Sequence, residues 1–210
     1  GRRRCRGGLR CCARWLRSAG RWASITPSGP ELAAAILAEL PQDTRRVIEL
    51  GGGTGAITRA LLASGIPDSE LLVLELNAAL HAQLAHDFPR SSIVLGDAAE
   101  LPRLAREAGY LDGGPADAVV SGLGLLAMER ATQARILRAA FECLRPDGAF
   151  VQFTYGPMSP VGDELRDELG LVARHGVLCL DRFVARAGAI AGLQGLFSAQ
   201  HVPFGDQCRL

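Results

Sequence analysis

The chain has 210 residues, 48% hydrophobic and 21% charged, which suits one α/β domain and is too short for two. No apolar run reaches the roughly 18 residues that span a bilayer, and the six cysteines and four histidines lack disulfide-frame or zinc-site spacing; we expect reduced thiols, a cytoplasmic protein and no metal. The net charge of +1 hides eight arginines that precede the first acidic residue, Glu31, whereas the remainder carries 15 basic and 22 acidic side chains.

Residues 1–23 are predicted to form a basic amphipathic arm. On a helical wheel of residues 9–22 the arginines gather on one side, and Trp15, Leu16 and Trp22 lie on the other. Such a helix can lie in a membrane interface, where each arginine near anionic headgroups contributes on the order of 1 kcal/mol. The alternatives are an apolar face packed on the domain and a cleaved organellar transit peptide.

The globular domain is predicted over residues 24–186, and it opens with a helix. Ser28 and Glu31 form a capping box before an apolar run, which predicts a helix over residues 30–40 that ends before Pro41. A strand, a glycine turn and a second helix follow over residues 47–62, with glycines at 51, 53 and 55. This is the element with which nucleotide-binding α/β domains hold a ligand against a helix N-terminus.

Residue types around this turn separate the candidate ligands. A phosphate-binding P-loop needs a lysine, and the chain has none. A dinucleotide fingerprint is formally present as Gly51-x-Gly53-x-x-Ala56, but a carboxylate at Glu49 would repel a pyrophosphate and attract a cation. S-adenosylmethionine carries an ammonium and a sulfonium and no phosphate, so the turn favours it over NAD. A glycine turn without a ligand remains the structural alternative.

Two further strands end in acidic residues. Residues 71–75 are predicted as a strand that ends at Glu75, placed to accept hydrogen bonds from both ribose hydroxyls, and a helix follows over residues 77–87. A short strand at 92–95 leads to Asp97, which can accept from the adenine amine or cap the helix that begins near Glu100. Together with Glu49, these acids form a constellation that suits a cationic adenosyl ligand.

The remaining strands supply candidates for the acceptor side of the site. A strand at 116–120 is followed by Ser121, a helix over 129–144, a turn at 145–148 and a strand at 149–155 that contains Gln152 and Tyr155. Because open α/β sheets bind ligands at the carboxyl ends of their strands, Ser121, Gln152 and Tyr155 are candidate catalytic residues. A tyrosine with its hydroxyl at the surface is the structural alternative. The alternation of strand and helix predicts a mostly parallel, twisted sheet with helices on both faces.

With these segments in view, the chain resembles the class I S-adenosylmethionine-dependent methyltransferases, which have a Rossmann-like α/β fold. The resemblance rests on residues 47–55, 74–75, 96–98 and the turn at 144–148. It implies S-adenosyl-L-methionine as cofactor, bound by Glu49, Gly51, Gly53, Gly55, Glu75, Leu76, Asp97 and Ala98. Narrower stretches at 24–28, 120–126, 151–156 and 159–161 resemble the bacterial phospholipid N-methyltransferases, which methylate phosphatidylethanolamine toward phosphatidylcholine.

The resemblance implies a phospholipid substrate at an anionic membrane surface and a peripheral position on the inner face of the cell membrane. The related rRNA adenine dimethyltransferases are the nearest alternative, but their Asn-Leu/Ile-Pro-Tyr/Phe motif is replaced here by Ser121-Gly122-Leu123-Gly124. The acidic body also offers no broad basic surface, so we expect no stable nucleic-acid partner.

The resemblance stops after residue 178. The phospholipid family continues with an Asn-x-Pro-Pro-Ala segment, which is absent here, and residues 187–210 form a Gly/Ala-rich tail with weak periodicity. The last strands of the sheet are therefore left without a prediction. A non-catalytic S-adenosylmethionine-binding protein with a degenerate C-terminus is the alternative of another class.

Overall fold

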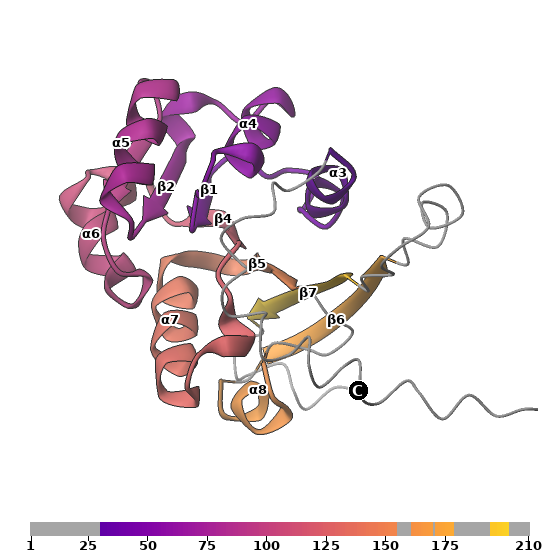
Figure 1. Ribbon diagram of the computed structural model, residues 1–210. Coiled ribbons are helices and arrows are strands. Elements are labelled where there is room, and N and C mark those ends of the chain that lie inside the picture. Colours follow the sequence, from indigo (N-terminus) through magenta and orange to yellow (C-terminus); the bar gives the residue numbers. More distant parts are fainter. Residues whose placement is uncertain (1–29, 155–160, 170, 179–193, 202–210) are drawn as a thin grey trace, which may run out of the picture.

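The computed structural model describes residues 30–154, 161–169, 171–178 and 194–201 (Figure 1). The predicted arm 1–23, the Ser28 cap and Tyr155 lie outside these ranges. The described part contains a single sheet in the order β3-β2-β1-β4-β5-β7-β6. Its strands are β1 (Val47–Leu50), β2 (Leu71–Glu75), β3 (Ser92–Leu95), β4 (Ala116–Ser121), β5 (Leu144–Thr154), β6 (Leu171–Leu178) and β7 (Gln194–His201).

Strands β1 to β5 are parallel, and β7 runs antiparallel between β5 and β6. The order reverses between β1 and β4, and this reversal is the point where open α/β sheets bind ligands beyond the carboxyl ends of their strands. The predicted α/β class and mostly parallel sheet are confirmed. Strand β7 comes from the tail that has no predicted element, and it pairs with β5 from Ala149↔Gln200 to Thr154↔Gly195.

Helices cover both faces of the sheet (Figure 1). One face carries α3 (Pro30–Ala38), α4 (Ala56–Ala63) and α5 (Ala78–Asp87), and the other carries α6 (Leu101–Glu107), α7 (Arg130–Cys143) and α8 (Asp163–Leu169). The described residues also contain the short 3₁₀ turns η1 (Asp68–Glu70), η2 (Ala98–Glu100), η3 (Tyr110–Gly113) and η4 (Leu125–Ala127). Within this described part, no helix is long and apolar enough to cross a membrane.

Alternation along the strands divides the core into two clusters. Ile48 and Leu50 of β1 pack with α6 and α7, whereas Val47, on the opposite side of the strand, packs with α3 and α4. All four residues of β1 are fully buried, as expected for the middle of a parallel sheet covered on both faces. Glu49 is the polar member of this strand, so its burial needs a chemical explanation.

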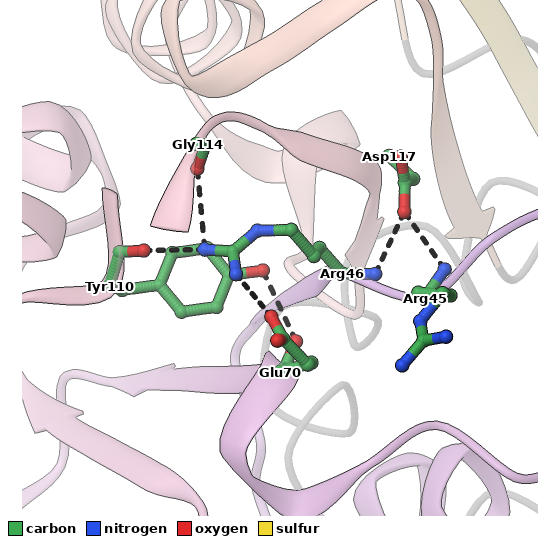
Figure 2. Close-up of polar contacts among 6 residues, drawn as sticks. All are labelled: Arg45, Arg46, Glu70, Tyr110, Gly114 and Asp117. Carbon is green, nitrogen blue, oxygen red and sulfur yellow. Dashed lines mark hydrogen bonds and ion pairs between the residues drawn. The ribbon is translucent and has the colours of Figure 1, made fainter. Parts of the chain in front are cut away.

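The amino-terminal edge of the sheet is fastened by ionic and hydrogen bonds (Figure 2). The Arg46 guanidinium pairs with Glu70, donates to the carbonyls of Tyr110 and Gly114, and lies 4.5 Å from the Tyr110 ring centroid. Asp117 accepts from the backbone N–H groups of Arg45 and Arg46, each at 2.8 Å. Burial alone would raise the pKa of Asp117, but these bonds and Arg145 outweigh it and lower the pKa. The network ties β1, β2 and β4 together on the edge opposite the glycine turn.

The turn predicted at residues 145–148 lies inside a strand. Strand β5 begins at Leu144, which pairs with Ala116, and the register then shifts so that Ala149 pairs with Ala118. Asp147 takes a positive φ of 62°, a conformation that Asp tolerates better than most residues. The sequence motif therefore forms an irregularity within β5, in which residues 145–148 lie opposite Asp117 alone.

Candidate active site

The glycine turn connects the end of β1 to the start of α4. The Gly51 N–H donates to the Leu74 carbonyl at 2.8 Å, and Gly55 caps α4 in the left-handed conformation with φ 79° and no side-chain cap. A Cβ added at Gly53 would meet only the Gly51 carbonyl oxygen, at 3.9 Å. Backbone N–H groups at the helix start and open space at Gly53 are what close approach of a ligand to the chain requires.

Glu75 lies at the end of β2 and binds the glycine turn directly. One carboxylate oxygen accepts from the Gly53 N–H at 2.9 Å, and the other accepts from the Asn77 N–H at 2.8 Å. The side chain is only 7% exposed, so the carboxylate is held rigidly beside the turn. Leu76 follows with 71% exposure, the highest among the exposed large apolar side chains that the structure describes. A fixed carboxylate beside an exposed apolar side chain fits a ribose and an adenine ring.

Asp97 follows β3 and caps η2. A cap is one of the two roles that its position predicts, and a contact with adenine is the other. Its Oδ1 accepts from the Ala99 N–H at 2.9 Å at the start of η2, and the side chain is exposed. Ala98 is buried beneath it. The two residues stand at the same carboxyl edge as Glu75, because Glu75 pairs with Leu95 in the β2–β3 register. The adenine role of Asp97 stays a prediction.

Glu49 is fully buried on the α4 side of the sheet. Thr58 Oγ1 on α4 donates to Glu49 Oε2 at 2.6 Å, and Oε1 has no hydrogen-bond partner among the described residues. Burial raises the pKa of the Glu49 carboxyl to about 8; the bonds from Thr58 oppose this rise, and the charge of Glu75 adds to it. Without a ligand, Glu49 is therefore mostly neutral at pH 7. Only the ionised Glu49 carboxylate would attract a cation.

The substitution Glu49→Gln tests this burial through the pH dependence of stability. The folded carboxyl holds its proton more tightly than the unfolded one, so between pH of about 4.5 and 8 unfolding releases a proton and wild-type stability falls as pH rises. We expect Glu49→Gln to remove this slope. The unfolding free energy of the wild type relative to that of Glu49→Gln should therefore fall by on the order of a few kcal/mol between pH 5 and 9. Urea unfolding of the cofactor-free protein measures it.

The control for this experiment is Glu129→Gln, because Glu129 is exposed and caps α7 without a side-chain hydrogen bond. It should follow the wild-type curve at both pH values. Parallel stability curves for wild type and Glu49→Gln would contradict a raised pKa at Glu49.

Ser121 and Gln152 are neighbours across β4 and β5, in register with each other and fully buried. Ser121 Oγ accepts from the Leu123 N–H at a long 3.4 Å, and Gln152 Nε2 donates to the Leu123 carbonyl at 2.8 Å. Both side chains thus contact the backbone of the turn after β4. Tyr155, the third candidate, lies outside the described residues, and the three catalytic roles stay predictions.

The turn after β4 touches the glycine turn. The Gly122 N–H donates to the Leu50 carbonyl at 2.9 Å, and a Cβ on Gly122 would lie 3.3 Å from the Gly51 carbonyl oxygen. A Cβ on Gly51 would lie 2.9 Å from Leu123 Cδ2. The glycine turn and the turn after β4 therefore pack closely at Gly51 and Gly122, where a larger residue would crowd Leu123 or the Gly51 carbonyl.

Thr58 and Gln133 contribute to the site and were not singled out from the sequence, whereas Leu123 lies in the stretch 120–126 that carries the resemblance. Thr58 had a signal: it is polar and lies between Ile57 and Leu61 on the buried face of α4. Gln133 had none, because its contacts join α7 to the turn after β4, and the approach of these segments depends on the whole fold. In the described ranges, no group of three or more His, Cys, Asp or Glu side chains is arranged to hold a metal ion.

Comparison with known proteins agrees with this geometry. The sequence model of a family described as "Methyltransferase domain" matches residues 47–148. The ornithine lipid N-methyltransferase of Singulisphaera acidiphila is 32% identical over 139 residues, which cover 64% of this chain and 71% of that protein.

Solved structures share the fold. TrmN from Thermus thermophilus superposes with a TM-score of 0.57 at 21% identity over 89% of this chain, which spans only 53% of TrmN. The glycopeptide N-methyltransferase MtfA complexed with S-adenosyl-L-methionine gives 0.55 at 16% identity, covering 85% of this chain and 96% of MtfA. An S-adenosylmethionine-dependent methyltransferase from Mesorhizobium loti gives 0.60 at 20% identity, covering 82% and 98%.

The fold and the site therefore define a Rossmann-like domain built for an adenosyl cofactor. The chain belongs to the class I S-adenosylmethionine-dependent methyltransferases. Its cofactor is S-adenosylmethionine, and the open space at Gly53, the paired oxygens of Glu75 and the exposed Leu76 fit that molecule.

Proposed function

We propose that this enzyme transfers methyl groups from S-adenosylmethionine to the amine headgroup of a phospholipid, carrying phosphatidylethanolamine toward phosphatidylcholine. The observation that carries the lipid amine as acceptor is the 32% identity to an ornithine lipid N-methyltransferase over 71% of that protein. The sequence stretches at 120–126 and 151–156, which resemble phospholipid N-methyltransferases, support a lipid amine as acceptor. We further propose a cytoplasmic enzyme held at the inner face of the membrane by the arginine-rich arm.

The cofactor, when bound, supplies an electrophilic methyl group on a sulfonium. The lone pair of the lipid amine would take this methyl group as the sulfonium becomes a neutral thioether, and the methylated amine would lose a proton to water. Positioning contributes most of the rate, because the reacting atoms must meet at roughly 3 Å in line. No covalent enzyme intermediate is needed.

The chain's own residues have separate roles in this proposal. Glu75 and the glycines of the turn hold the nucleoside, and Leu76 and Ala98 contact its base. Tyr155 orients the amine, and its ring can face methylammonium products through cation–π contact. Ser121 and Gln152 act on the acceptor through the backbone of Leu123, which both contact in the structure.

An ornithine lipid is a second candidate acceptor. The name of the Singulisphaera relative favours it, and such a lipid offers a primary amine, as phosphatidylethanolamine does. The same in-line attack serves both acceptors.

The test is incubation of the full chain with methyl-labelled S-adenosylmethionine and anionic vesicles that contain phosphatidylethanolamine or an ornithine lipid. A parallel reaction contains total ribosomal RNA. We expect label in the phosphatidylethanolamine fraction. Label confined to the ornithine lipid would move the acceptor to the second candidate, label in RNA would replace the lipid proposal, and bound cofactor without transfer would indicate a non-catalytic protein.

A further inference from the structure

The segment Ser121–Met128, here called the post-β4 turn, forms the carboxyl edge of the sheet beside the glycine turn. It is in direct contact with that turn through Gly122 and Leu123. Its own bonds are short-range: Leu125 N–H donates to the Leu123 carbonyl at 2.8 Å, and Met128 N–H donates to the Leu125 carbonyl at 3.0 Å. Short 3₁₀ turns have poor hydrogen-bond geometry, so such a segment depends on outside contacts for its shape.

Two glutamine amides, one on β5 and one on α7, donate to carbonyls of the post-β4 turn. Gln152 on β5 donates to the Leu123 carbonyl at 2.8 Å. Gln133 on α7 donates through Nε2 to the Leu125 carbonyl at 2.6 Å and to the Met128 carbonyl at 3.3 Å. The amide of Gln133 therefore links α7 both to Leu125, the first residue of η4, and to Met128, the residue that follows η4.

The post-β4 turn, held by these two amides, exposes some of its residues and buries others. Leu125 is fully buried and anchors the turn from below, whereas Leu126 is 49% exposed. Gly122 and Gly124 are also exposed, so the outer side of the turn is small and apolar. An exposed leucine beside the cofactor turn suits the glycerol and acyl region of a lipid whose amine reaches the site.

We propose that Gln133 is a positioning residue that holds the post-β4 turn in the shape that admits the acceptor. This inference rests on the proposed function, because the acceptor it serves is the lipid amine. Among the described residues, the side-chain hydrogen bonds of Gln133 go to the Leu125 and Met128 carbonyls and none goes to the glycine turn or to Glu75, so we expect its effect to reach the reaction through the post-β4 turn.

The test compares Gln133→Met, which keeps side-chain length and removes the N–H donors, with Gln133→Lys, which restores donors. For Gln133→Met we expect kcat/KM for the lipid to fall about 10-fold to 100-fold, since small displacements near reacting groups carry such costs. The Kd for S-adenosylmethionine should stay within about two-fold, because the Gln133 side chain bonds to the post-β4 turn and to no residue of the predicted cofactor site. Gln133→Lys should recover most of the activity. Arg135→Gln, on the exposed side of α7, should match wild type.

Hydrogen exchange of the peptide over residues 121–129 supplies a readout that needs no lipid. We expect faster exchange in Gln133→Met and wild-type protection in Gln133→Lys and Arg135→Gln. Unchanged exchange and unchanged lipid kinetics in Gln133→Met would overturn the inference, as would equal losses of cofactor and lipid affinity, which indicate a general loss of structure. If the wild type methylates no lipid, the proposed function fails, and the exchange result still decides whether Gln133 holds the turn.

Discussion

Gly55→Val should destabilise the fold strongly, whereas Gly53→Val should stay closer to wild-type stability and lose cofactor binding. Both glycines have positive φ, 79° and 55°, which costs a β-branched residue on the order of 1–2 kcal/mol. Their surroundings separate them. A Cβ at Gly55 would lie 2.6 Å from Phe88 Cε2 and 3.2 Å from Leu84 Cδ2, inside a packed core, so the added overpacking brings the loss to roughly 3 kcal/mol or more.

At Gly53 the added Cβ meets only the Gly51 carbonyl oxygen, at 3.9 Å, so the valine points into the space that the cofactor needs. Thermal unfolding and equilibrium dialysis with labelled S-adenosylmethionine measure the two effects. Gly109→Val is the matched control, with φ 71° and only Asp112 Oδ2 near its Cβ at 3.5 Å, away from the glycine turn. It should lose stability as Gly53→Val does and keep cofactor binding. Wild-type affinity in Gly53→Val would place the cofactor elsewhere.

Glu75→Gln should weaken S-adenosylmethionine binding by at least about 100-fold. Two hydrogen bonds from ribose hydroxyls to a carboxylate contribute about 1.5–3 kcal/mol each, and an amide can accept only through one oxygen. In the wild type the two carboxylate oxygens accept from the N–H groups of Gly53 and Asn77. In Glu75→Gln the amide N–H₂ group would replace one of these oxygens and face an N–H donor. The glycine turn therefore loses an anchor together with the ligand contact.

Equilibrium dialysis measures the affinity of Glu75→Gln, and thermal unfolding shows how much of the loss comes from the turn itself. Glu100→Gln is the control, because Glu100 is exposed and pairs with Arg103 on the surface. A Glu75→Gln protein that binds the cofactor as wild type does would remove Glu75 from the site.

Strand positions were the most predictable part of the fold. The apolar runs at 71–75 and 92–95 match β2 and β3 residue for residue. For β2 the reason is that a strand buried on both faces appears as a continuous hydrophobic stretch bounded by turn residues. Strand β3 is only half-buried and was found from its short β-branched run between turn residues. The Arg-Pro-Asp-Gly motif was harder, since a local motif does not show whether partner strands continue past it. Strand β7 was not predictable from its Gly/Ala-rich composition, because its place comes from pairing with β5 and β6.

The candidate site also has features that the sequence predicts and features that it does not. Glycines and acids at strand ends were visible as residue types at fixed spacing, and Glu75 lies where that spacing predicts. The state of Glu49 was not visible, because its pKa depends on burial beneath α4 and on the bond from Thr58. The contacts of Gln152 and Gln133 with the post-β4 turn depend on how β5 and α7 pack, which no local pattern encodes.

The central claim is that a glycine turn with acidic strand ends holds an adenosyl sulfonium and no dinucleotide. Isothermal titration of the full chain with S-adenosylmethionine, and in parallel with NADH, tests it most directly. The account predicts binding of S-adenosylmethionine with a Kd in the micromolar range, about −8 kcal/mol, and no heat of binding from NADH. Binding of NADH without binding of S-adenosylmethionine would contradict it.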